Sequence, residues 1–162
     1  AAAADVQVSY LRAGDLIRTG SCRIQVLYPK PGQTVPSGEE NSASLVLAVH
    51  YKEMDFLLTG DLEGPGEEAL ADTLTACEYL KAAHHGSRNS TGEAFLEAAA
   101  PAVCVISAPE NSVYGHPHRE TLDRLRQAGT RIFCTSRCGA IRAVTDGQTI
   151  EVFTFLSEYD IL

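Results

Sequence analysis

The chain has 162 residues, of which 44% are hydrophobic, and its formal net charge is −8 at pH 7. This length accommodates one domain with a hydrophobic core and is too short to predict two, while the acidic balance argues against a broad basic surface for nucleic acid. No apolar run approaches the roughly 20 residues that a membrane-spanning helix needs, and the alanine-rich start lacks the basic leader of a secretory signal, so we expect a soluble domain whose membrane attachment would lie outside these residues.

Short strands are predicted along the whole chain from runs that alternate or are rich in β-branched residues and that Gly, Pro or Asp bound. In chain order they are residues 6–11, 23–29, 44–51, 56–60, 79–83, 102–108, 131–136, 140–145 and 149–155. Asp146 and Gly147 predict a tight hairpin between the last two. Lys52 and Glu53 predict a softer hairpin between 44–51 and 56–60.

Helices are predicted at 67–74, 92–100 and 117–129. The first has acidic residues in its first turn, where they complement the helix dipole. Ser90 and Glu93 have the spacing of a capping box at the start of the second, which Pro101 ends. Strands therefore come first, strands alternate with helices in the middle, and strands close the chain, which predicts an α/β layer structure.

One long loop is predicted at residues 29–41, where Pro and Gly are frequent, and loops of this length are often near a functional site. The cysteines are odd in number and lie mostly in apolar runs, which indicates buried thiols rather than a disulfide framework. Cys134 and Cys138 are four residues apart, but no second pair makes a zinc site of them.

Polar side chains follow three of the predicted strands, where an α/β sheet normally forms its site. Asp61 ends FLLTGD, and His84 and His85 end YLKAAHH. The third group lies in one loop and comprises Asn111, Ser112, Tyr114, His116 and His118. Aspartate and neutral imidazole are suitable ligands for Zn or Mn, and a carboxylate can bridge two ions. Such a dinuclear site would polarise a phosphoryl oxygen and lower the pKa of a bound water.

Each of these groups also has an ordinary structural interpretation. Asp61 could be a turn residue or helix cap. One of the paired histidines could hydrogen-bond the loop while the other is exposed, and the histidines around Pro117 could lie on the surface at the start of a helix. His50 alternates with apolar neighbours on a strand, and we interpret it as structural.

Several well-known motifs are absent. HPHRET contains the His-x-His half of an HxHxDH metal motif, but Glu120 and Thr121 stand where Asp and His would be needed. The chain has no P-loop, no GxSxG nucleophile elbow and no GxGxxG. These absences leave nucleotide cofactors, serine hydrolysis and dinucleotide binding without support.

Four segments in order resemble one known family. They are NSASLVL (Asn41 to Leu47), FLLTGD (Phe56 to Asp61), LKAAHHGS (Leu80 to Ser87) and NSVYGHP (Asn111 to Pro117). At these intervals they resemble the metallo-β-lactamase-like domain at the end of the ComEC competence proteins, a family of DNA-uptake channels. The resemblance covers about residues 6–155.

The resemblance implies an αββα sandwich of two similar halves, with two divalent ions, Mn or Zn, that hydrolyse DNA. The implied role is to degrade the strand that is not imported. Asp61 then matches the bridging, catalytic aspartate and His84 a metal ligand, while His85 is the less probable ligand and a candidate catalytic contact to phosphate. The loop beside the cleft supplies catalytic His116 for substrate contact or proton transfer. Substrate-binding residues would be Ser87, Asn111, Ser112 and Tyr114.

The implied partners are single-stranded DNA and the membrane-embedded channel portion of the same parent protein. The domain would lie outside the bilayer, on the extracytoplasmic face of a bacterial cytoplasmic membrane. Asn41 and Ser44 match a strand opening near the site, for architecture rather than catalysis. With an acidic chain, bound cations would supply the charge that holds DNA.

The chain departs from the family in one large respect, because it lacks both HxHxDH and a further upstream histidine. We therefore interpret residues 1–162 as a single unit that forms the second half of a longer domain. Asp61 and His84 alone are too few ligands for two metals, so the unit by itself is expected to be inactive. Two alternatives stay open: a metallo-phosphoesterase of another substrate, and a non-catalytic module that docks DNA or a partner.

Overall fold

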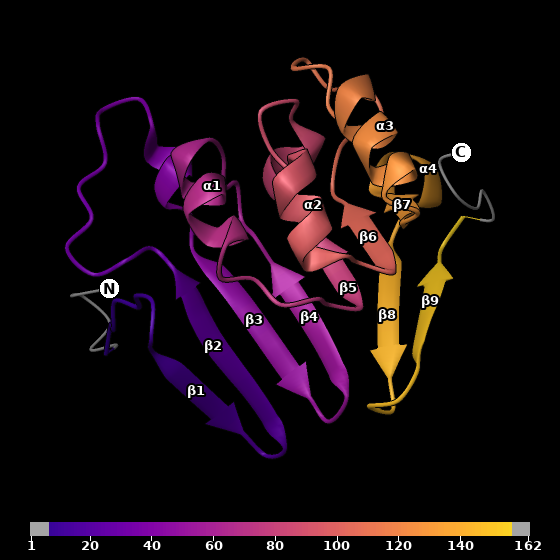
Figure 1. Ribbon diagram of the computed structural model, residues 1–162. Helices are drawn as coiled ribbons and strands as arrows, with labels where there is room; N and C mark the ends of the chain where they lie inside the picture. Colours follow the sequence, from indigo (N-terminus) through magenta and orange to yellow (C-terminus); the bar gives the residue numbers. More distant parts are fainter. Residues whose placement is uncertain (1–6, 157–162) are drawn as a thin grey trace.

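The computed structural model describes residues 7–156. Its main element is a mixed sheet of seven strands (Figure 1). The strands are β1 (Leu16–Thr19), β2 (Cys22–Tyr28), β3 (Val46–Tyr51), β4 (Met54–Leu58), β5 (Tyr79–Lys81), β6 (Val103–Ile106) and β7 (Arg131–Cys134), followed by the separate hairpin β8 (Ile141–Thr145) and β9 (Ile150–Thr154). The helices are α1 (Pro65–Ala71), α2 (Glu93–Ala99), α3 (Arg119–Gln127) and the short α4 (Thr135–Cys138), with 3-10 turns η2 (Glu40–Ala43) and η3 (Ala83–Gly86).

The order of the strands in the sheet follows the order in the chain from β1 to β7. β1 to β4 pair antiparallel, and β4 to β7 pair parallel. Crossovers between parallel strands are almost always right-handed, so strands that advance in one direction place their connecting helices on the same face. α1, α2 and α3 lie together on one face of the sheet (Figure 1). The carboxyl ends of β4, β5 and β6 consequently meet at one edge.

The main core lies between the sheet and these helices. Cys104 and Ile106 of β6 point to this side and belong to one buried cluster with Leu70 of α1, Phe95 of α2 and Leu125 of α3. Alternation along a strand sends the neighbouring side chains to the opposite face. The helical layer is therefore held by every second residue of the parallel strands.

A second, smaller core lies on the other face. Val103 and Val105 of β6 and Phe133 of β7 are buried there, against Ile141 of β8 and Val152 of β9. The β8–β9 hairpin thus covers the parallel half of the sheet from the side away from the helices. The result is a three-layer arrangement of helices, sheet and hairpin.

The predicted α/β class is confirmed by this mixed sheet with flanking helices. Both hairpins are confirmed as well, with Tyr51 opposite Met54 and Thr145 opposite Ile150. Cys77, Cys104, Cys134 and Cys138 are buried, as the apolar runs around them predict, and Cys22 is partly exposed.

The predicted strand at residues 6–11 is wrong over its described part, because residues 7–11 form no strand. The edge strand is instead β1, whose four residues are all exposed. Its partner follows directly through a turn at Gly20, where φ is +56°, and Leu16 pairs with Gln25 of β2. Pairing with an adjacent strand outweighs the local β-propensity of an unpaired run.

The capping box at Ser90 is also wrong. The N-cap residue of α2 is Gly92, and the Ser90 hydroxyl donates to the carbonyl oxygens of Ala83 and Ser87, each at 3.0 Å. The Gly92 amide donates to the Glu67 carboxylate at 2.6 Å. A carboxylate from α1 therefore holds the N-cap residue of α2, and no side chain caps the amides of the helix itself.

Among residues 7–156 no helix is both long enough and apolar enough to cross a bilayer.

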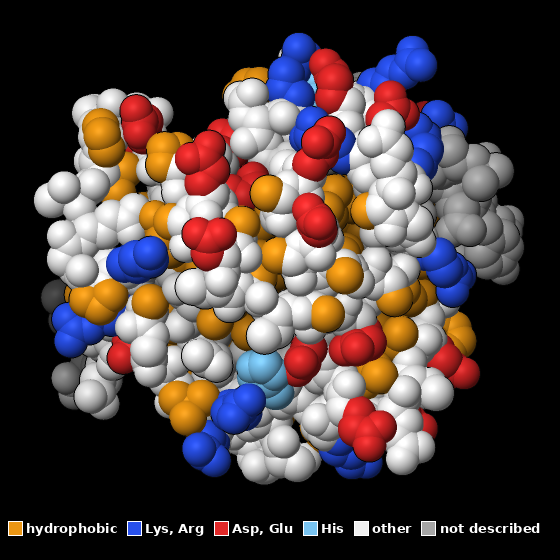
Figure 2. Space-filling model, viewed as in Figure 1, with side chains coloured by type: hydrophobic (Ala, Val, Ile, Leu, Met, Phe, Trp, Pro, Cys, Tyr) orange, Lys and Arg blue, Asp and Glu red, His pale blue; other side chains and the backbone are white. Residues whose placement is uncertain are grey.

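On the face seen in Figure 2, acidic side chains gather over α1 and α2, and Lys and Arg side chains lie mostly toward the rim. This distribution agrees with the net charge of −8.

Candidate active site

The three polar groups predicted from sequence lie at the edge where β4, β5 and β6 end. Asp61 follows β4, His84 and His85 form the turn η3 after β5, and His116 lies in the loop between β6 and α3. Because the carboxyl ends of parallel strands share one edge, residues distant in sequence are brought together there.

Four imidazoles form a cluster at this edge. The ring centroid of His116 lies 5.3 Å from that of His84, 6.4 Å from that of His85 and 4.8 Å from that of His118. Burial, together with the neighbouring imidazoles, lowers the pKa of His116 against the opposing effect of Glu63. The lowered pKa favours the neutral form of the His116 ring, which has a lone pair that can accept a proton.

Asp61 faces this cluster. Its Oδ1 lies 3.8 Å from Nε2 of His85 and 3.9 Å from Nζ of Lys81. The Asp61 amide donates to the Ser44 hydroxyl at 3.2 Å, and Lys81 Nζ donates to the Gly60 carbonyl oxygen at 2.9 Å. Burial lowers the pKa of Lys81, although the Asp61 charge opposes this shift. The loop after β4 is thus held from two sides with its carboxylate half exposed.

The orientation of His85 is set by its backbone contact. Nδ1 lies 2.6 Å from the carbonyl oxygen of Ser107. A carbonyl only accepts, so Nδ1 carries the hydrogen and, in the neutral ring, Nε2 keeps its lone pair. That lone pair is on the nitrogen nearer Asp61, which is the orientation that metal-binding histidines commonly adopt.

His84 is oriented by Glu63, a residue that the sequence analysis missed. Glu63 Oε1 lies 2.9 Å from Nδ1 of His84 and accepts a hydrogen bond from the Ser87 hydroxyl at 2.6 Å. Burial alone would raise the pKa of Glu63, but the hydrogen bonds from Ser87 and His84 and the charge of His84 outweigh it and lower the pKa. Asn41 also approaches His84, with Nδ2 3.3 Å from Nδ1.

The backbone of this turn is strained. His84 and His85 have φ values of +42° and +56°, a region that costs a non-glycine residue about 1–3 kcal/mol. The next residue, Gly86, has φ of +81°, and a Cβ there would lie 2.7 Å from Cβ of Pro117. Only glycine allows the two histidine-bearing loops to approach this closely.

The loop before α3 forms the rim. The Ser112 hydroxyl accepts the His116 amide at 3.1 Å and so supports the loop. Asn111 is exposed, and Tyr114 is 76% exposed with its ring centroid 5.9 Å from that of His116. Ser87, by contrast, is only 4% exposed and its hydroxyl is engaged with Glu63, so in this structure it supports the turn.

Two hollows adjoin the histidine cluster. One of about 530 Å³ is lined by His85, Ser107, Ala108, Pro109, Glu110, Thr135 and Ser136. The other, of about 460 Å³, is lined partly by Asn111, Ser112 and His116. The exposed imidazoles therefore border open, polar space rather than an enclosed apolar cavity.

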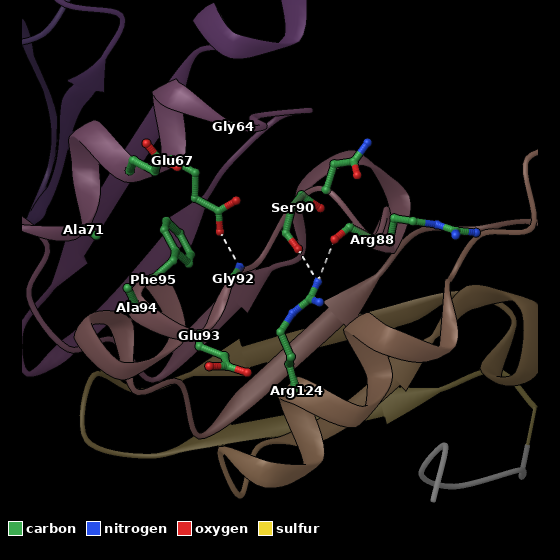
Figure 3. Close-up of a pocket in the computed structure, with 12 residues that line it drawn as sticks. Gly64, Glu67, Ala71, Arg88, Ser90, Gly92, Glu93, Ala94, Phe95 and Arg124 are labelled. Carbon is green, nitrogen blue, oxygen red and sulfur yellow. Dashed lines mark hydrogen bonds between the residues drawn. The ribbon is translucent and has the colours of Figure 1, made fainter.

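A further hollow of about 440 Å³ lies between α1, α2 and α3 and shows what holds the histidine loop from behind (Figure 3). Arg124 of α3 donates to the carbonyl oxygens of Arg88, Ser90 and Thr91 at 2.8–3.1 Å. Glu67 is 7% exposed, and burial raises its pKa to about 7 against the lowering effect of backbone hydrogen bonds from Gly92 and Thr91.

The donor chemistry of the site suits Zn or Mn, but the number of converging donors falls short. Asp61 and the Nε2 atoms of His84 and His85 are of the right type. Within residues 7–156, however, no group of three His, Cys, Asp or Glu side chains could hold a metal ion. The described residues therefore supply donors of a suitable type without forming a metal-binding group among themselves.

The structure thus brings together Asp61, His84, His85 and His116, and places Asn111 and Tyr114 at the rim. Glu63 was missed, and His118 was named among the polar residues of its loop but was given no role. His118 accepts the Arg88 amide on Nδ1 at 3.2 Å, which joins its loop to the histidine turn. The one sequence signal for Glu63 was its position two residues after Asp61 in the same loop.

An α/β sheet with imidazoles and carboxylates grouped beyond its strand ends defines a class of site suited to proton transfer or metal binding. No family model matches the chain. The chain is 33% identical over 139 residues to ComE operon protein 3 of Bacillus subtilis, a match that covers 85% of this chain and 18% of that protein.

Two further relatives agree with this match. Recombination protein 2 of Haemophilus influenzae is 33% identical over 118 residues, covering 73% of this chain and 15% of the relative. Competence protein ComA of Neisseria gonorrhoeae is 32% identical over 125 residues, covering 72% and 18%. The chain is therefore homologous to a segment of competence proteins, and it spans less than a fifth of the length of these curated relatives.

Proposed function

We propose that this chain supplies part of a metal-dependent hydrolase centre in a DNA-uptake protein of natural competence, and that the centre degrades the DNA strand that is not imported. The observation that carries the proposal is the Asp61 carboxylate 3.8 Å from Nε2 of His85, beside two further imidazoles. Homology to competence proteins supplies the biological setting.

In this proposal Asp61 and His84 would hold the metal, and Asp61 would be the ligand that the two ions share. A bound Mn²⁺ or Zn²⁺ would polarise a phosphoryl oxygen and lower the pKa of a coordinated water. His85 either binds metal through Nε2 or contacts the phosphate, and His116 accepts or donates the proton. The remaining ligands come from parts of the parent protein outside the described residues, so the 162-residue chain alone is inactive.

DNA binding in this proposal depends on metal charge and on the rim. An acidic protein can hold a phosphodiester when bound cations provide the local positive charge. Tyr114, which is 76% exposed, offers a face on which a base of single-stranded DNA stacks. Asn111 and Ser112 would contact the sugar-phosphate backbone, and the buried Ser87 would act through Glu63.

The parent protein would be attached to the bacterial cytoplasmic membrane, and this domain would lie on the extracytoplasmic face beside the channel portion of the same polypeptide. That arrangement would place hydrolysis of one strand next to the entry path of the other.

The decisive experiment compares the full-length natural protein that carries these residues with its Asp61→Ala variant. We expect Mn²⁺-stimulated hydrolysis of single-stranded DNA that Asp61→Ala abolishes. Asp72→Ala, at an exposed aspartate just after α1, is the matched control and should leave hydrolysis unchanged.

One observation favours a second function. The shortage of converging donors within residues 7–156 is also what a non-catalytic docking module would have. If the folded, metal-loaded full-length protein cleaves no DNA, the nuclease proposal fails. Binding of DNA without cleavage would then establish docking, and cleavage of another phosphoester would establish a different substrate.

A further inference from the structure

Glu63 links the two ends of the histidine turn. Its carboxylate lies 2.9 Å from Nδ1 of His84 and accepts the Ser87 hydroxyl at 2.6 Å. The Ser87 amide in turn donates to the His84 carbonyl oxygen at 2.9 Å. Glu63 therefore contacts His84 and Ser87, which lie on either side of the sharpest part of a turn whose backbone conformation is unfavourable by itself.

Two groups compete for Nδ1 of His84. An ionised carboxylate only accepts, so its contact requires a hydrogen on Nδ1, whereas the Asn41 amide nitrogen, 3.3 Å away, only donates and requires a lone pair there. The carboxylate contact is shorter and charge-assisted, and such hydrogen bonds are about twice as strong as neutral ones. The Asn41 amide is free to donate to Glu63 instead, which is consistent with its effect on that carboxyl.

We propose that Glu63 is a positioning residue that fixes His84 in the tautomer with hydrogen on Nδ1, so that Nε2 presents its lone pair to a metal ion. The metal part of this inference rests on the proposed function, whereas the tautomer part does not. The same kind of contact orients His85 through the Ser107 carbonyl, so both imidazoles of the turn carry their lone pair on Nε2.

The tautomer is tested first, on the metal-free 162-residue chain, by NMR of the imidazole nitrogens. In the unchanged chain we expect hydrogen on Nδ1 of His84. In Glu63→Ala the Asn41 amide becomes the near partner of Nδ1, so the hydrogen should move to Nε2. In Glu63→Gln, which retains the size of the side chain but both donates and accepts, we expect a mixture.

Two controls accompany this measurement. Asn41→Ala removes the competing donor and should leave hydrogen on Nδ1, and Glu97→Gln makes the same exchange at an exposed glutamate of α2. If His84 keeps hydrogen on Nδ1 in both folded Glu63 variants, the inference is overturned whatever the protein hydrolyses.

Metal binding is tested second, by titrating the full-length protein with Mn²⁺ alone. Loss of an orienting partner typically weakens metal binding about 10–100-fold, and we expect this for Glu63→Gln relative to Glu97→Gln. Equal affinities would overturn the positioning role. If the unchanged protein binds no Mn²⁺, the proposed function fails, and the tautomer result still decides the role of Glu63.

Discussion

His84 and His85 adopt left-handed backbone conformations next to a glycine that cannot be replaced without a clash with Pro117. Such strain persists only where surrounding contacts hold it, and it tends to occur at functional sites. Here the contacts are one side chain, Glu63 on His84, and one backbone group, the Ser107 carbonyl on His85. At the scale of single residues, the site therefore depends on pairwise hydrogen bonds that orient imidazoles.

Glu67 gives a pH-dependent prediction at this scale. Its pKa is raised from 4.5 to about 7, chiefly by burial, so the folded chain binds this proton more tightly than the unfolded chain does. The contribution of Glu67 to stability is therefore fully present below about pH 4.5 and is lost as the pH rises through about 7. A shift of this size corresponds to a change on the order of 3 kcal/mol.

Glu67→Gln should remove that loss, because Gln cannot ionise and still accepts the Gly92 amide. Urea unfolding at several pH values between about 5 and 8 would measure it, and the variant should gain stability relative to the unchanged chain as the pH rises. Glu68→Gln, on the exposed side of α1, is the matched control. Parallel pH profiles for Glu67→Gln and the unchanged chain would contradict the prediction.

At the scale of elements, the histidine loop is held by helices that lie before and after it. The carboxylate of Glu67 in α1 accepts the amide of Gly92, the N-cap residue of α2, and the guanidinium of Arg124 in α3 donates to three carbonyl oxygens of the loop (Figure 3). Loops that carry functional side chains are more precise when rigid elements support them.

Replacement of Arg124 by Met retains the apolar stem and removes the guanidinium. Three carbonyl oxygens lose a charged donor, and we expect the free energy of unfolding to fall by on the order of 2–3 kcal/mol. Urea denaturation would measure the change. Arg119→Met, at an arginine of the same helix whose side chain is 90% exposed, should cost less than about 0.5 kcal/mol. Equal effects of the two substitutions would show that the hydrogen bonds of Arg124 do not stabilise the loop.

At the scale of the whole molecule, the sheet separates two cores of unequal size. The helical side contains the larger cluster, and the β8–β9 hairpin covers Val103, Val105 and Phe133 on the opposite side. The histidine cluster lies beyond the carboxyl ends of β4, β5 and β6, whereas the hairpin packs on the face of the sheet. The hairpin therefore contributes to stability without contributing side chains to the cluster.

Phe133→Ala should consequently destabilise the protein by about 3–5 kcal/mol, the usual cost of a large cavity. Phe133 is 1% exposed, whereas Phe153 of β9 is 47% exposed and serves as the matched control. Thermal or urea unfolding of both variants would test this. A small effect at Phe133 would contradict this expectation and would indicate that the hairpin repacks to fill the cavity.

Much of the fold was predictable because its signals are local. Asp146 and Gly147 define a turn within four residues, and Leu122 and Leu125 lie on one face of a helix that ends before Gly129. β1 was not predictable in this way, since its four exposed residues carry no alternation and pair only because a partner strand follows.

The sequence by itself determined the α/β class, both hairpins, and the placement of Asp61, His84, His85 and His116 after strand ends, because each depends on neighbours within a few residues. Only the tertiary structure decided that Glu63 orients His84, that Glu67 accepts the amide of Gly92 at the N-cap of α2 and that His118 accepts the amide of Arg88. These contacts join residues far apart in the chain, and their hydrogen bonds exist only after parallel pairing brings the carboxyl ends of β4, β5 and β6 to one edge.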